Sequence, residues 1–194
     1  MSRYTISDQD LVVLYIRGDE NALEELIKRY RTKVYTTILL QVKNAAIAED
    51  IFQDAFIKVI NTLRAGKYNE EGKFLPWVIR IAQNLVIDHF RKEKRTPIIT
   101  TSDGFDIFKV LHFTDENVED RMLRDQAYSD LRKLILKLPS EQREVLIMRH
   151  YADLSFKEIA DITDVSINTA LGRMRYALNN LRKMLKLKEL SLKQ

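Results

Sequence analysis

Apolar residues recur along this chain at spacings of three and four, and almost no stretch alternates between apolar and polar residues. That spacing places side chains on one face of an α-helix, so it predicts an all-α fold. In the first half, helices are predicted to follow Ser7 and Asp19 and to run over about 46–63 and about 75–95. Ser7 with Asp10 resembles a capping box, and Gly18 marks the first stop.

The predicted helices of the first half each divide into an apolar and a polar face. On the second helix the apolar face holds Leu23, Leu26, Ile27, Tyr30, Val34 and Ile38. On the fourth it holds Phe74, Trp77, Val78, Ile81, Ala82 and Leu85. The polar face of the third helix carries Asp50, Gln53 and Asp54, and that of the fourth carries Arg80, Gln83, Asn84, Ile87 and Arg91.

Composition changes after residue 95. Pro, Gly, Ser and Thr gather there, which is typical of a linker. The stretch also contains an apolar set, Phe105, Ile107, Phe108, Val110, Leu111 and Phe113. This set either packs back on a domain or docks on a partner, and the residues do not decide between the two. We expect two small helical domains, 1–95 and 121–194, joined by a flexible linker over 96–120.

The second half ends in a helix-turn-helix pattern. Helices are expected from about Glu116 to Pro139 and after Ser140, whose side chain is expected to cap the second of them. Ser155 and Glu158 then form a capping box for a short helix, and Ser166 caps a long final one after a tight turn.

The final helix is predicted to bury one face and to present the other. Ile167, Ala170, Met174, Ala177, Leu178 and Leu181 share the inward face. The outward face holds Asn168, Thr169, Gly172, Arg175, Tyr176 and Asn179, with Arg173 on its flank. Amide and guanidinium groups at the start of such a helix can read base edges in the major groove. An ordinary amphipathic helix with a solvated basic face would show the same spacing.

Composition narrows the classes of function. The 194 residues carry a net charge of +4 and no Cys, which excludes disulfides and thiolate metal sites. The charge is uneven: residues 1–95 carry +3, 96–128 carry −4 and 129–194 carry +5. We see neither a signal peptide nor an apolar run long enough to span a membrane, so we expect a cytoplasmic protein without membrane insertion.

A second candidate nucleic-acid surface lies before and along the fourth helix. Lys67 and Tyr68 precede it, and the run RKEKR ends it at 91–95. Cations interleaved with aromatic rings suit single-stranded nucleic acid, because bases stack on rings while cations meet phosphates. Trp77, the only Trp, either stacks on a base or anchors the helix in the core.

Three segments in order carry a resemblance to a known family. They are AEDIFQDAF at 48–56, FLPWVIRIAQNLVIDHFRK at 74–92 and LPSEQREVLIMRHYADLSFKEIADITDVSINTALGRMRYAL at 138–178. Together they resemble the extracytoplasmic-function (ECF) class of bacterial sigma factors, the small two-domain form.

The resemblance implies a transcription initiation factor with core RNA polymerase and promoter DNA as partners, and often an anti-sigma factor. It implies that Asp50, Gln53 and Asp54 dock on core polymerase. The −10 element would be met by Lys67, Tyr68, Asn69, Trp77, Arg80, Asn84, Asp88 and Arg91. The −35 duplex would be read by Asn168, Thr169, Gly172, Arg173, Arg175, Tyr176 and Asn179. The linker would thread through the polymerase.

Two departures from the family pattern leave the promoter sequence open. Many relatives have a basic residue where this chain has Leu171, and Ser where it has Gly172. We expect Leu171 to pack rather than to read bases, since it borders the apolar face.

Other classes of function fit the residues less well. A DNA-binding regulator that acts without polymerase is the main alternative, but it has no use for the polar face at Asp50. An enzyme is disfavoured, because His89, His112 and His150 are scattered and no nucleophile or phosphate-binding motif is present. We expect no cofactor, no metal and no small-molecule substrate.

Overall fold

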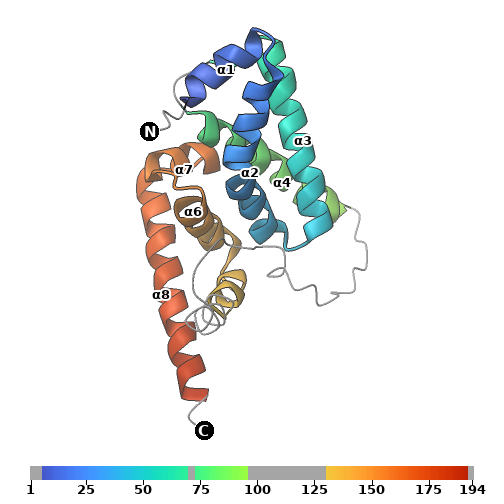
Figure 1. Cartoon of the computed structure of the whole chain (residues 1–194). Coiled ribbons are helices and arrows are strands. Elements are labelled where there is room, and N and C mark those ends of the chain that lie inside the picture. Colours follow the sequence, from blue (N-terminus) through green and yellow to red (C-terminus); the bar gives the residue numbers. More distant parts are fainter. Residues whose placement is uncertain (1–5, 70–72, 96–129, 192–194) are drawn as a thin grey trace, which may run out of the picture. The chain divides into compact units, whose positions relative to one another are not determined.

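The computed structural model describes residues 6–69, 73–95 and 130–191. The chain divides into two units, residues 1–100 and 101–194, and each is described by itself. Every regular element among the described residues is a helix, which confirms the predicted fold class (Figure 1). The apolar set at 105–113 and the helix expected from Glu116 to residue 129 lie outside the described residues. The domain limits at 95 and 120 stay predictions.

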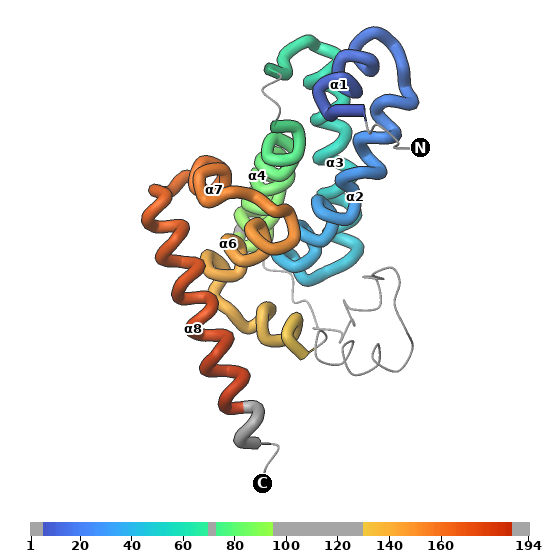
Figure 2. The backbone as a smooth tube through the Cα atoms, turned by 60° about the vertical axis from the view of Figure 1, so that its left-hand side comes forward, coloured from blue at the N-terminus to red at the C-terminus, as the bar shows by residue number. Residues whose placement is uncertain are grey.

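The first unit contains four helices, α1 (Asp8–Ile16), α2 (Glu20–Val42), α3 (Ala45–Arg64) and α4 (Phe74–Arg95). The predicted cap of α1 is confirmed, since the Ser7 side chain accepts from the Asp10 amide, and α2 starts after Asp19 as predicted, with the Asp19 side chain accepting from the Asn21 amide. Helices α2, α3 and α4 contact one another, and α1 contacts α2 and α3 (Figure 2).

The predicted inward face of α4 is partly wrong. Ile79, Val86 and Gln83 are buried, whereas Ile81 and Leu85 are only half-buried. Because α4 packs against both α2 and α3, a wider arc of its surface is covered than one stripe provides. Gln83 was expected on the polar face, but it accepts a hydrogen bond from Gln41 of α2 at 2.9 Å. That bond pairs the NH2 group of Gln41 with the carbonyl oxygen of Gln83, as expected for buried polar groups.

A polar cluster fastens α1 to α2. The Asp8 carboxylate accepts from Arg29 Nη1 at 2.6 Å and from the Tyr30 hydroxyl. Arg29 also donates to the Ile6 carbonyl at 3.0 Å. Burial, together with the hydrogen bond to Asp8, raises the pKa of Tyr30 to about 12. The neutral phenol therefore persists as a donor through the neutral range.

The second unit holds a helical segment at 130–136 and then α6 (Ser140–Tyr151), α7 (Phe156–Thr163) and α8 (Ile167–Ser191). The expected cap at Ser140 is wrong. The Pro139 carbonyl accepts the Arg143 amide at 2.9 Å, so Pro139 occupies the cap position and Ser140 is the first helical residue. Proline has no side-chain acceptor, so no side chain caps α6.

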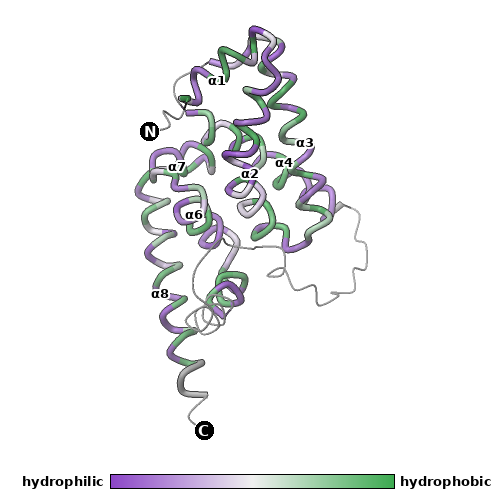
Figure 3. Tube along the Cα trace, viewed as in Figure 1, coloured by the Kyte–Doolittle hydropathy of each residue, from purple (hydrophilic) through white to green (hydrophobic). Residues whose placement is uncertain are grey.

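A small core joins the helices of the second unit. Its buried members are Leu134, Ile135, Leu138, Leu146, Ala177 and Leu181. Figure 3 shows hydrophobic and hydrophilic residues alternating along α8, as expected for a helix with one covered face. Ala170 is buried as predicted, but Ile167 and Leu178 are exposed, and Leu171 is 44% exposed rather than packed. The covered arc of α8 is therefore narrower than the predicted apolar face.

Candidate nucleic-acid and protein interfaces

The outward ridge of α3 is formed by Asp50, Gln53 and Asp54, all of them exposed. Asn44 caps this helix by accepting the Ile47 amide at 3.2 Å. On the opposite face Ile51, Phe52, Ala55, Phe56 and Val59 are buried. Packing of this buried face fixes the orientation of α3, and it thereby keeps the polar ridge exposed.

Ile57 extends this ridge and was missed by the sequence interpretation. It is 54% exposed and follows Asp50 by seven residues and Gln53 by four, which places it on the same face. An isoleucine inside an outward polar stripe is the signal that could have revealed it. The ridge thus combines two carboxylates and an amide with one apolar contact.

Lys67, Tyr68 and Asn69 lie in the loop that leads towards α4, and the structure describes the loop only as far as Asn69 before it resumes at Lys73. Lys67 and Asn69 are exposed, and Tyr68 is half-buried. Tyr68 therefore differs from its two neighbours, because part of its side chain is covered by the rest of the unit.

Tyr68 belongs to an aromatic cluster at the start of α4. Its ring centroid lies 4.3 Å from that of Trp77 and 6.2 Å from that of Phe74. Phe74 is 1% exposed and also contacts Tyr30 of α2, at 5.9 Å between centroids. Trp77 is half-buried, so it anchors this cluster while keeping part of its ring accessible. Both of the interpretations considered for Trp77 therefore remain compatible with its position.

The outward ridge of α4 continues from Trp77 through Arg80, Asn84, Asp88 and Arg91. The last four are exposed, and at 1.5 Å per residue the ridge from Trp77 to Arg91 spans about 21 Å. Arg91 Nη1 lies 3.5 Å from Asp88 Oδ1, an exposed pair one turn apart. The ridge therefore alternates cationic, amide and acidic groups.

Helix α7 is capped at both ends, and its C-terminal cap forms the turn into α8. Ser155 Oγ accepts the Glu158 amide at 3.2 Å, and the Glu158 carboxylate accepts the Ser155 amide at 2.7 Å. Asp164 ends α7 in the left-handed region, with φ 53°. Such a conformation favours Gly but is tolerated by Asp, so the chain makes the tight turn without the common glycine.

The predicted outward face of α8 is exposed at Asn168, Arg175, Tyr176 and Asn179, and Tyr176 is 64% exposed. Thr169 is exposed too, but its hydroxyl lies 2.8 Å from Ser166 Oγ and its amide donates to the same atom at 3.0 Å. Thr169 is therefore partly engaged in the cap.

Gly172 and Arg173 lie beside this outward face and are half-buried. A methyl group at Gly172 would meet nothing within 4 Å, so packing inside the described chain does not require glycine. Hydrogen bonds from its own backbone and from Ser140 lower the pKa of Glu141, and the charges of Arg173 and Arg143 add to this. Arg173 is thus electrostatically linked to α6.

The described residues also limit what other sites are possible. Among them, no three His, Asp or Glu side chains gather in a way that could hold a metal ion. None of the described helices is both long and apolar enough to cross a membrane.

Comparisons with known proteins agree with this arrangement. A family model described as Sigma-70 region 2 matches residues 26–96, and one described as Sigma-70, region 4 matches residues 128–181. The chain is 29% identical over 174 residues to the ECF RNA polymerase sigma factor SigW of Bacillus subtilis, covering 88% of this chain and 92% of that one. It is 31% identical over 171 residues to the RNA polymerase sigma-H factor of Pseudomonas aeruginosa, covering 86% and 88%.

A solved structure supports the fold. The sigma factor RpoE, in complex with the anti-sigma factor NepR from Bartonella quintana, aligns with a TM-score of 0.66 at 19% identity, over 84% of this chain and 96% of RpoE. These matches define the class of protein as a sigma factor, an initiation factor of transcription. The chain belongs to the ECF sigma factors, and it is thus an alternative sigma factor that directs RNA polymerase to promoters. Membership of this family decides against a regulator that acts without polymerase.

Proposed function

We propose that the α3 ridge, Asp50, Gln53, Asp54 and Ile57, docks this chain on core RNA polymerase. The support is its exposure and its chemistry: carboxylates and an amide surround one apolar side chain. Interfaces commonly combine an apolar contact with polar neighbours that set orientation. Electrostatic complementarity then requires a cationic surface on the polymerase.

The loop before α4 and the α4 ridge meet the −10 element in this proposal. Arg80 and Arg91 are exposed cations that can contact phosphates, and Asn84 offers an amide to a base edge. The rings of Trp77 and Tyr68 pack against each other at 4.3 Å between centroids, with their planes tilted by 39°, so an unpaired base has an aromatic surface beside it. Lys67 and Asn69 flank this surface.

The α7–α8 pair reads the −35 element as duplex DNA. The observation that carries this proposal is that α8 starts from a side-chain cap and exposes Asn168, Arg175 and Asn179 along one face. Asn can pair with adenine and Arg with guanine through two hydrogen bonds each. Gly172, between them, leaves room for the helix to approach the base pairs closely.

The remaining parts of the proposal concern the setting in which the chain works. RpoE is bound to an anti-sigma factor in its solved structure, and we extend that kind of partner to this chain. Its place of action is the cytoplasm, where polymerase and promoters meet. It acts by binding and not as an enzyme, without metal, cofactor or small-molecule substrate.

Run-off transcription tests this function. Core RNA polymerase is combined with the purified chain on a library of promoter fragments with randomised −35 and −10 elements. Transcripts that require the chain and that share both elements are the expected result. Core polymerase that gains no start sites from any library member would overturn the proposal.

A further inference from the structure

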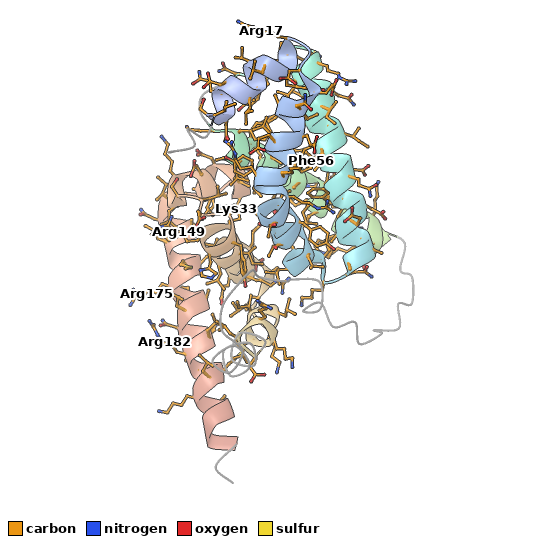
Figure 4. All side chains as sticks on the ribbon, in the orientation of Figure 1. Arg17, Lys33, Phe56, Arg149, Arg175 and Arg182 are labelled. Carbon is orange, nitrogen blue, oxygen red and sulfur yellow. The ribbon has the colours of Figure 1, made fainter. Side chains whose placement is uncertain are left out.

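The outward face of α8 continues past the helix-turn-helix. Arg182, Lys183 and Lys186 follow Asn179 by three, four and seven residues, and all three are exposed. At 100° per residue they lie within about 60° of Asn179 around the helix. Figure 4 shows Arg175 and Arg182 pointing outward from the same side of α8. We name Arg182, Lys183 and Lys186 the distal basic stripe.

Two features set this stripe apart from the base-reading part of α8. The region 4 family model ends at residue 181, so the stripe lies beyond the matched segment. From residue 182 to the end of the chain the sequence holds five basic residues and a single acidic one, Glu189. The stripe thus consists of cations alone and lies outside the segment that the family model matches.

The stripe is connected to the predicted base contacts. Arg182 Nη1 donates to Asn179 Oδ1 at 3.2 Å, so the guanidinium is held beside a residue of the reading face. If α8 binds DNA, Arg182 and Asn179 therefore lie close to the same nucleotides.

The length of α8 indicates what the stripe meets. Its 25 residues extend about 37 Å, whereas the major groove is about 12 Å wide. If the first turns enter the groove, the later turns must pass the phosphates that border it. Cations on that later face contact the backbone and carry no base information.

We propose that the distal basic stripe binds phosphates of the promoter duplex next to the −35 element. The proposal rests on the proposed function of α8 and adds a sequence-independent anchor to it. Duplex DNA is favoured over an acidic protein segment because the stripe and the reading face form one continuous surface. The anchor raises affinity for every −35 sequence alike, while Arg175 and Asn168 select among sequences.

The test compares two double variants, Arg182→Ala/Lys186→Ala and Lys133→Ala/Lys137→Ala. The second pair removes the same charge from exposed residues of the same unit outside α8. Holoenzyme of each is titrated by fluorescence anisotropy against two duplexes, a promoter selected from the library and the same fragment with a scrambled −35 element, at several salt concentrations.

The stripe variant is expected to lose affinity by the same factor on both duplexes. Its log–log slope of affinity against salt should become shallower by about 0.9 per lost phosphate contact, or about 1.8 for both. The Lys133/Lys137 variant should keep the wild-type slope. An unchanged slope with intact promoter selection would overturn the stripe alone.

Two further outcomes distinguish this proposal from a role of the stripe in binding protein and from a failure of the proposed function. If the stripe variant keeps its DNA slope but binds core polymerase more weakly, the stripe faces protein and the DNA assignment is wrong. If no promoter can be selected at all, the proposed function fails, and a duplex of arbitrary sequence still shows whether the stripe contacts phosphate.

Discussion

The two candidate DNA-reading helices, α4 and α8, differ in what surrounds them. Helix α4 packs against both α2 and α3 and starts in an aromatic cluster, and its outward ridge mixes both signs of charge. Helix α8 is covered on one side by a small core, and its outward face carries amides, cations, a threonine and an exposed tyrosine but no acidic residue.

This difference suits two states of DNA. Unpaired bases need rigid rings on which to stack, and an aromatic cluster fixed by a tight core supplies them. A duplex presents fixed base edges and two rows of phosphate, which amides and cations on a helix can meet. The chain therefore separates the proposed tasks by unit, and each task can be broken without the other.

The largest expected effect comes from the aromatic cluster of the first unit. Phe74→Ala removes a ring that is 1% exposed and contacts Tyr30, Tyr68 and Trp77. Such truncations cost about 3–5 kcal/mol of unfolding free energy. Because Trp77 is the only Trp, urea unfolding followed by its fluorescence reports the first unit alone. Ile57→Ala, on the exposed α3 ridge, is the control and should change the midpoint little.

Charge reversal on α3 should break polymerase docking while leaving that unit folded. Asp50→Lys/Asp54→Lys places like charges against the polymerase, which costs several kcal/mol, so affinity for core should fall more than about 100-fold. Both side chains are exposed, and the Trp77 unfolding midpoint should stay within experimental error. Glu93→Lys, an exposed charge reversal on α4 away from the ridge, is the control and should leave affinity for core unchanged. Unchanged affinity of the double variant for core would contradict the docking assignment.

Arg175→Ala should reduce the preference for one base of the −35 element, whereas a matched variant in the first unit should not. Loss of a guanine contact costs about 1–3 kcal/mol at one −35 position and relaxes the preference there. Arg80→Ala on α4 is the matched comparison, since it removes one exposed cation from the other reader. Binding of holoenzyme to a panel of −35 variants measures both. An equal loss on all −35 sequences would mark Arg175 as a phosphate contact.

Periodicity predicted most of this architecture because helix faces and caps are local properties. The caps at Ser7, Ser155 and Ser166 were all expected from residues within one turn. The errors came from tertiary packing. Gln83 is polar by type but buried, because Gln41 from another helix satisfies its amide. Leu171 is apolar but exposed, because the covered arc of α8 is narrower than the predicted apolar face.

The candidate sites followed the same rule. Exposed polar stripes could be predicted on α3, α4 and α8, since each lies opposite a buried face. The sequence interpretation missed Ile57, because the outward face of the third helix was identified from its polar residues, and it did not foresee the contact between Tyr68 and Trp77. That contact joins a loop to a helix, and no spacing within either segment encodes it.

The smallest expected effect concerns the capping box of α7 and measures how much it stabilises the helix-turn-helix of the second unit. Ser155→Ala removes the acceptor for the Glu158 amide and should cost about 1 kcal/mol. Since α7 is only eight residues long, this loss acts on the whole turn into α8. Hydrogen exchange of the α7 amides should rise, whereas the Trp77 unfolding midpoint should not move. Ser155→Thr keeps a hydroxyl that accepts the Glu158 amide and donates to the Glu158 carboxylate, and should restore protection. Exchange in α7 that is unchanged by Ser155→Ala would show that packing on α8, rather than the capping box, holds the helix-turn-helix in place.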